Sequence, residues 1–207
     1  MENNSQRRGI LCVVSGPSGS GKTTLCRAFN DEDPECSYAI SCTTRPMREG
    51  EVNGRDYHFL DEKEFLTRVE AGDLLEHARV HGNLYGTLKS SVLEQVERGQ
   101  DVLIDIDVQG AALIREHQDP GIQASYTDIF VMPPSQQELE SRLGGRGTES
   151  EEDFALRMKN AQEEIEQWPH YAYAIVSGSR EDDLQKFRSI IHGERNRASR
   201  LKISSKP

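Results

Sequence analysis

Residues 16–24, with the sequence GPSGSGKTT, hold glycines and a lysine at a spacing that can bind phosphate. They follow directly on an apolar run, residues 10–14, and match the pattern GxxxxGK[ST] of a phosphate-binding loop between a strand and a helix. The glycines let several backbone N–H groups converge on one anion at the start of a helix, where the helix dipole also favours negative charge. An ordinary glycine-rich turn is the alternative, which the complete motif after a strand disfavours.

A metal site is predicted beside this loop. Lys22 can reach the outer phosphates of a nucleoside triphosphate, and the Thr23 hydroxyl can hold Mg2+ that bridges them. A second apolar run, residues 102–104, leads directly to Asp105, which has the position of a Walker B acid that acts on the metal or its waters. Asp107 follows at the same strand end, where a carboxylate is costly unless it is used. The alternative role of Asp107 is to cap a helix over residues 108–116.

Arginines gather in two glycine-containing segments of a chain that is otherwise acidic. Arg45, Arg48 and Arg55 lie near Tyr57 in sequence, and proline and glycines exclude a continuous helix there. Because guanidinium groups bind phosphate in a bidentate way and a tyrosine hydroxyl adds one bond, a phosphate fork is predicted; a solvated loop is the alternative. The second segment, residues 142–157, predicts a hinged lid that brings positive charge over phosphates, with an exposed loop as its alternative.

Strands and helices are predicted to alternate, which indicates an α/β fold with a parallel sheet wrapped by helices. Helices are expected to begin at residues 22, 90, 108 and 136, and two more to end near residues 168 and 195. Asp61 is expected to cap a further helix that runs through residue 71, with Glu64 three positions on as in a capping box. Glu76 falls in the strand expected over residues 74–80. A glutamate on an edge strand is usually just solvated, which is the alternative to a functional role for Glu76. The basic tail from Arg195 is expected to fray. The expected strands are residues 10–14, 38–42, 74–80, 102–106, 126–132 and 173–176.

Composition limits the classes of protein to consider. A chain of 207 residues predicts one domain, and its net charge of −10 argues against a general nucleic-acid or anionic-membrane surface. The first residues are not expected to form a signal peptide, because they pass directly into a strand-length apolar run, and no apolar run approaches the ~18 residues of a membrane-spanning helix. The 4 cysteines lack metal-ligand spacing and are expected to be free thiols in a reducing compartment, so the cytoplasm is the expected location.

From residue 10 to about residue 191 the chain resembles the guanylate kinase family. The matches are GPSGSGKT, SCTTRPMREGEVNGRDYHF, the isolated Glu76, NLYGT, LIDIDVQG, and RLGGRGTE with Arg157 beyond it. The resemblance implies a single domain, residues 1–207, built from three parts. These are a P-loop NTPase core with a parallel β-sheet flanked by helices (1–44 and 88–207), a small α+β insertion that binds GMP (45–87), and a lid (about 142–157).

The resemblance also implies which residues form each site. Mg2+ would lie on Thr23 and, through water, on Asp105. The implied ATP-binding residues are Gly16, Pro17, Ser18, Gly19, Ser20, Gly21, Lys22, Thr23 and Thr24. The implied GMP-binding residues are Ser41, Arg45, Arg48, Tyr57, Glu76, Tyr85, Thr87 and Asp107, with Glu51 in a supporting role. The implied catalytic residues are Lys22, Arg45 and the lid arginines Arg142, Arg146 and Arg157.

The chemistry of these residues agrees with the choice of guanine. Guanine presents N1–H and a 2-amino group as adjacent donors, which Glu76 and Asp107 can accept, whereas adenine would leave these carboxylates unpaired. The hydroxyl of Thr87 or Ser41 can meet the O6 or N7 acceptor. The implied reaction is in-line transfer of the γ-phosphoryl group of ATP to GMP, and to dGMP, without a covalent intermediate. The expected partners are these small molecules, and neither nucleic acid nor a membrane.

One departure from the family pattern and two alternative functions stay open. Ser177 and Gly178 stand where the family usually has Asn-Asp, which leaves the donor-nucleotide range open. Oligomeric state, with a homo-oligomer as one option, and regulation are also open. A ribose bisphosphate kinase would share the P-loop and lid but needs no guanine pocket. A guanylate-kinase-like scaffold domain binds peptides and typically has an eroded P-loop, whereas Lys22 and Thr23 are intact here.

Overall fold

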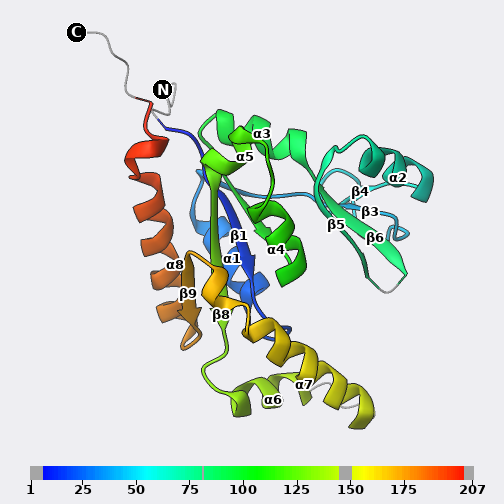
Figure 1. Ribbon diagram of the computed structural model, residues 1–207, viewed down its shortest axis with the longest axis vertical. Helices are drawn as coiled ribbons and strands as arrows, with labels where there is room; N and C mark the ends of the chain where they lie inside the picture. Colours follow the sequence, from blue (N-terminus) through cyan, green and yellow to red (C-terminus); the bar gives the residue numbers. More distant parts are fainter. Residues whose placement is uncertain (1–6, 81, 145–150, 203–207) are drawn as a thin grey trace.

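The central sheet of the protein is parallel and is covered by helices on both faces. The structure is a computed structural model that describes residues 7–80, 82–144 and 151–202. Five strands run in the order β2-β7-β1-β8-β9, and every neighbouring pair is parallel. Figure 1 labels β1, β8 and β9 of this sheet. The predicted α/β fold with a parallel sheet is therefore confirmed. The strands are β1 (Leu11–Ser15), β2 (Cys36–Tyr38), β7 (Asp101–Asp105), β8 (Tyr126–Met132) and β9 (Tyr173–Val176).

Strand β1 lies at the centre of this sheet and is buried on both faces. Its side chains alternate, so that Cys12 and Val14 pack toward helices α1 (Lys22–Glu32) and α8 (Arg180–Arg195). Leu11 and Val13 pack on the opposite face, toward α3, α4 and α5. A continuous apolar run is what such a doubly covered strand requires. The helices of that face are α3 (Lys89–Glu97), α4 (Val108–Arg115) and α5 (Pro120–Ser125).

A second, four-stranded sheet lies beside the central one, with strand order β4-β3-β6-β5 (Figure 1). Helix α2 (Glu62–Glu70) packs on it through the fully buried Phe65, and Asp61 caps this helix by accepting a hydrogen bond from the backbone of Glu64, as predicted. The strands are β3 (Cys42–Thr43), β4 (His58–Phe59), β5 (Leu74–Val80) and β6 (Asn83–Leu88).

The single strand predicted over residues 38–42 was wrong, because the chain changes sheets within it. Tyr38 pairs with Leu103 in the central sheet, whereas Cys42 pairs with Gly86 and His58 in the second sheet. The switch occurs between the backbone N–H of Ala39, which donates to Leu103, and the carbonyl of Ser41, which accepts from His58. Apolar periodicity shows that a segment is extended but not which neighbours it pairs with. The second sheet thus begins at Cys42.

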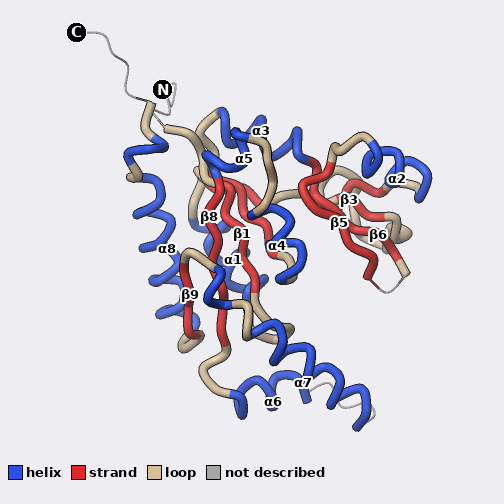
Figure 2. The backbone as a smooth tube through the Cα atoms, in the orientation of Figure 1, coloured by secondary structure: helices blue, strands red, loops and turns tan. Residues whose placement is uncertain are grey.

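Helices α6 (Gln136–Gly144) and α7 (Glu151–Ile165) form a third part, which extends away from the carboxyl ends of the central strands (Figure 2). Leu139, Leu143 and Ala161 form their shared apolar core. The chain returns to β9 through a short 3-10 helix, Trp168–His170, so the helix predicted to end near residue 168 ends at Ile165. No helix among the described ranges is long and apolar enough to cross a membrane.

The carboxyl-terminal tail is anchored through residue 200, so the predicted fraying from Arg195 was wrong for this part. Arg195 donates to Asp101 at 2.7 Å and pairs with Asp33 at 2.9 Å. Arg200 is 2 % exposed and donates to Glu194 at 2.8 Å and to the backbone carbonyl of Tyr126 at 2.9 Å. Most of these partners lie on distant segments, so a basic run in the sequence gives no sign of them.

Candidate functional site

The glycine-rich loop connects β1 to α1 at the carboxyl end of the central sheet. Gly16, Gly19 and Gly21 all have positive φ angles, 149°, 81° and 95°. A Cβ atom on Gly16 would lie 2.3 Å from the carbonyl oxygen of Val131, so no other residue fits there. Because a glycine, Gly21, precedes the first residue of α1, no cap side chain covers the N–H groups of its first turn. The loop therefore has the geometry of an anion-binding helix start.

The Lys22 ammonium and the Ser20 hydroxyl are polar side-chain groups of this loop that could meet a ligand. The Lys22 ammonium donates to the backbone carbonyls of Gly16 at 3.0 Å and Pro17 at 3.4 Å, and thus lies over the loop. The Ser20 hydroxyl is buried and has no hydrogen-bond partner within the described part of the chain. An ammonium and a hydroxyl in these positions fit a bound polyphosphate.

Thr23 and Asp105 meet at the edge of the loop. Val14 of β1 pairs with Asp105 of β7, which places the carboxylate beside the start of α1. The Thr23 hydroxyl donates a hydrogen bond to this carboxylate. Both groups are oxygen donors of the kind that Mg2+ prefers. Within residues 7–80, 82–144 and 151–202, no group of three or more His, Cys, Asp or Glu side chains is arranged to hold a metal ion, so phosphates and water would have to complete the coordination of a metal here.

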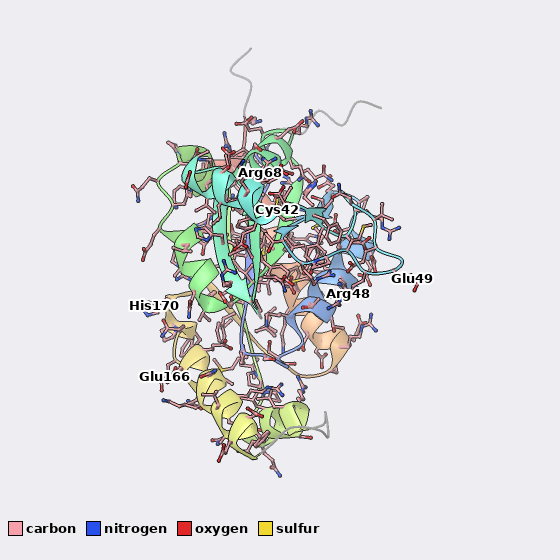
Figure 3. The ribbon with its side chains drawn as sticks, turned by 90° about the vertical axis from the view of Figure 1, so that its right-hand side faces the viewer. Cys42, Arg48, Glu49, Arg68, Glu166 and His170 are labelled. Atoms are coloured by element: carbon pink, nitrogen blue, oxygen red, sulfur yellow. The ribbon has the colours of Figure 1, made fainter. Side chains whose placement is uncertain are left out.

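A cavity of about 830 Å³ joins this edge to the second sheet. Figure 3 shows Arg48 on the loop between β3 and β4, and the neighbouring Glu49 at the outer edge of that loop. Most of the predicted acceptor-site residues line the cavity, and Thr87 is buried and contacts the lining residue Glu76. The predicted residues that line it are Thr23, Ser41, Arg45, Arg48, Glu51, Tyr57, Glu76, Tyr85, Asp105 and Asp107.

Arg45 is held in place by an acid and by aromatic rings. Its guanidinium forms a bidentate pair with Glu51, at 2.7 and 3.1 Å, and lies 5.4 Å from the ring centre of Tyr57. Glu51 also accepts a hydrogen bond of 2.7 Å from the backbone N–H of Arg48. The hydrogen bond from Arg45 lowers the pKa of Glu51, so this carboxylate is ionised at neutral pH. Glu51 therefore orients the arginine loop.

Glu76 is the buried carboxylate of the cavity. It is 7 % exposed and accepts a hydrogen bond of 2.8 Å from the Thr87 hydroxyl. Burial raises the pKa of Glu76 to about 7, and the charge of Asp107 contributes to the rise, whereas the bond from Thr87 opposes it. Glu76 is therefore not solvated as an edge-strand glutamate usually is, although β5 is an edge strand.

Asp107 has the helix-capping role that was its alternative interpretation. Its carboxylate accepts a hydrogen bond of 2.8 Å from the backbone N–H of Gly110 and so caps α4. The same residue also lines the cavity. Capping uses one carboxylate oxygen, Oδ1, so the two roles are compatible.

The predicted lid arginines are placed in part. Arg142 in α6 donates to Glu138 at 2.9 Å and lies 3.5 Å from the carbonyl of Gly19, which brings it against the glycine-rich loop. Arg157 lies in α7 and is partly buried. Arg146 lies outside the described residues.

Sequence reasoning missed Glu164 and Tyr38, which also face the site. Glu164 of α7 lies near Lys22 and the backbone of Ser18; burial raises its pKa, and these two neighbours oppose the rise. It is one of several acids on this helix, so nothing in its sequence context distinguishes it. Tyr38 lines the cavity at the end of β2. Its position at a parallel strand end was a usable signal, because ligand sites form there.

A glycine-rich loop after the central strand of a parallel sheet, facing arginines and a buried carboxylate across one cavity, defines a P-loop nucleotide-binding protein. Comparison with known proteins then gives the family. The family model described as guanylate kinase matches residues 8–194. The chain belongs to the guanylate kinase family, so the resemblance seen in the sequence is confirmed.

Individual relatives agree over nearly the whole chain. The guanylate kinase of Clostridium tetani is 42% identical over 197 residues, which cover 95% of this chain and 92% of that protein. The guanylate kinase of Syntrophotalea carbinolica is 46% identical over 197 residues, 95% of this chain and 91% of that protein. A crystal structure of guanylate kinase from Anaplasma phagocytophilum matches with a TM-score of 0.72 and 31% identity, over 96% of this chain and 93% of that one.

Proposed function

We propose that this chain transfers the γ-phosphoryl group of ATP to GMP, which gives ADP and GDP. Membership of the guanylate kinase family supports the reaction. The observation that carries the proposal is the single cavity that runs from Thr23 and Asp105, beside the P-loop, to the buried Glu76 in the second sheet. Two substrates bound at its two ends would meet at the transferring phosphoryl group, and positioning of this kind supplies much of the catalysis.

The acceptor end of the cavity is assigned to GMP, and residues 45–87 to the segment that binds it. Glu76 and Asp107 accept from N1–H and the 2-amino group of guanine, and Thr87 or Ser41 meets O6 or N7. The phosphate of GMP is bound by Arg45, Arg48, Tyr57 and Tyr85, with Glu51 holding the first two in place. The bidentate Arg45–Glu51 pair supports this assignment, because it sets the direction of the guanidinium before the phosphate arrives.

The donor end is assigned to ATP. The backbone N–H groups of residues 16–24 bind its phosphates, and Lys22 turns from the loop carbonyls to the outer phosphates. Thr23, and Asp105 through water, would hold Mg2+, which supplies positive charge to the phosphates when it is bound with ATP. Arg142, Arg146 and Arg157 are assigned to a lid, residues 142–157, that adds charge at the transferring group. The contact of Arg142 with the glycine-rich loop at Gly19 supports the role assigned to Arg142.

A panel of nucleoside monophosphates tests this proposal. ADP release is measured with ATP, Mg2+ and each of GMP, dGMP, AMP, CMP and UMP. GMP is expected to react, with dGMP next, and AMP to react about 10³- to 10⁴-fold less efficiently, because it leaves Glu76 unpaired. Equal use of AMP, or of a ribose bisphosphate, would overturn the guanine assignment. Absence of turnover from folded protein would instead favour a peptide-binding scaffold domain.

A matched pair of variants locates the acceptor base. Glu76→Gln keeps the shape of the side chain but places an amide group where guanine donors must bind, so it is expected to lower kcat/KM for GMP by at least about 100-fold. The KM for ATP is expected to stay within about twofold. Glu70→Gln, an exposed site on α2, is the control.

The free state and burial of all four cysteines support a reducing compartment, and we assign the enzyme to the cytoplasm.

A further inference from the structure

Tyr38 occupies the last position of β2, at the junction between the two sheets. It pairs with Leu103 of β7, the strand that ends at Asp105. Its ring packs against the apolar cluster that contains Cys26 and Phe29 of α1. Since the ring is fixed by this packing, the position of its hydroxyl is also fixed, at the edge of the cavity that Thr23 and Asp105 line.

The Tyr38 hydroxyl is buried, and no atom of the described residues forms a hydrogen bond with it. A buried hydroxyl without a partner costs free energy, so a role in the bound state would explain its presence. Asp105 lines the same cavity two residues beyond the pairing partner of Tyr38 on β7, and after burial, which is the larger cause, its charge raises the pKa of Tyr38. A phenolic hydroxyl has one hydrogen to donate, so Tyr38 can act as a donor beside this carboxylate.

Asp105 needs such a donor if it serves a metal. Its Oδ2 atom already accepts from Thr23, the other residue assigned to Mg2+. The Thr23 oxygen can bind the metal while its O–H still donates to Asp105, so this bond holds only one carboxylate oxygen and leaves the carboxylate free to rotate about it. A second donor on the neighbouring strand would limit that rotation, as outer-shell hydrogen bonds do for metal-binding side chains generally.

We infer that Tyr38 is a positioning residue for the magnesium-nucleotide complex: its hydroxyl donates to Asp105, or to a water between them, and holds the carboxylate toward the metal. The inference rests on the proposed function for the identity of the metal and nucleotide. Tyr38 touches neither reacting group, and it acts through Asp105. Its effect therefore falls on the coupling between Mg2+ and nucleotide, and not on nucleotide binding as such.

Calorimetric titration of ADP, with Mg2+ and separately with EDTA, measures this coupling without any turnover. Tyr38→Phe removes only the hydroxyl oxygen. It is expected to weaken ADP binding about three- to tenfold in Mg2+, the effect of one hydrogen bond, and to change it less than twofold in EDTA. Tyr173→Phe is the control. Tyr173 lies on β9, at the opposite edge of the central sheet, and its hydroxyl donates to Glu194 at 2.6 Å. This variant is expected to leave the ratio of ADP affinities in Mg2+ and in EDTA unchanged.

Stability and a double variant separate positioning from a structural role. Removal of an unpaired buried hydroxyl is expected to leave the melting temperature of the ligand-free protein unchanged or slightly higher. In an Asp105→Asn background, Tyr38→Phe is expected to cause no further loss of Mg2+ coupling. The inference would be overturned if Tyr38→Phe left the ratio of ADP affinities in Mg2+ and in EDTA unchanged, or if its effect on that ratio added to the effect of Asp105→Asn. Failure of the proposed function would appear separately, as no phosphorylation of GMP by the unsubstituted chain.

Discussion

The Thr87 hydroxyl donates a hydrogen bond of 2.8 Å to Oε1 of Glu76 across the neighbouring strands β6 and β5. Both side chains are buried, at 1 % and 7 % exposure. The bond fixes the carboxyl group in one orientation, while burial raises its pKa to about 7. Glu76 thus changes its charge within the physiological pH range, which couples recognition of the base to pH.

Binding of GMP is expected to strengthen as pH rises through 7. The folded, ligand-free protein holds a proton on Glu76 below this pH, and the guanine donors prefer the ionised carboxylate, so binding releases that proton. For a pKa near 7 the ionised fraction rises about tenfold between pH 6 and pH 8, and the association constant should follow it. Calorimetric titrations of GMP from pH 5.5 to 8.5 measure the change. Glu76→Gln, which cannot titrate, isolates the contribution of the GMP phosphate itself; an equal slope in this variant would contradict the assignment.

Sequence patterns predicted the central sheet well because its local signals agree. The strands at 126–132 and 173–176 have the predicted bounds, and the glycine-rich loop follows β1 as expected. Each of these segments is an apolar run bounded by turn or helix-start residues, so neighbouring residues alone determine it. The same holds for Asp61, whose cap on α2 depends on a backbone group three positions away.

Features that depend on distant partners could not be predicted in the same way. Cys42 follows Tyr38 closely in the chain but lies in another sheet, because its pairing residues come from β4 and β6. Glu164 differs from its acidic neighbours only through the P-loop that lies opposite it. The burial of Arg200 likewise requires carbonyls near β8. Such contacts are set by topology, which no local pattern encodes.

Glu51 is expected to control acceptor affinity without touching the donor site. Glu51→Gln removes the charge that holds Arg45 and accepts from the backbone of Arg48, so the arginine loop loses its orientation. We expect the KM for GMP to rise about tenfold, while the KM for ATP changes less than twofold. Steady-state kinetics with each substrate varied in turn measure both. The control is Glu49→Gln, on the same loop but at its outer edge (Figure 3). Equal effects of the two variants would show that only loop charge matters.

Arg200 is expected to stabilise the fold through its buried pair with Glu194. Arg200→Ala leaves that carboxylate, which has no exposed surface, without its buried partner, and also removes bonds to two backbone carbonyls. A loss of about 3–5 kcal/mol in the free energy of unfolding is expected. Arg197 pairs with the same carboxylate but is 57% exposed, so Arg197→Ala should cost less than about 1 kcal/mol. Urea denaturation of both variants measures the difference, and similar losses would contradict a special role for the buried pair.

Glu164 is expected to compete with nucleotide for the P-loop. The charge of Lys22 and the backbone of Ser18 act on its carboxylate, and the proposed function assigns both to the phosphates, so the carboxylate and the phosphates compete for the same positive groups. Glu164→Gln should therefore tighten ADP binding about threefold to tenfold in calorimetric titrations. Glu166→Gln is the control, because Glu166 is exposed just beyond the end of α7 (Figure 3). Weaker ADP binding in Glu164→Gln would mean that this carboxylate supports the bound nucleotide, which would reverse the sign of the interaction inferred from the ligand-free protein.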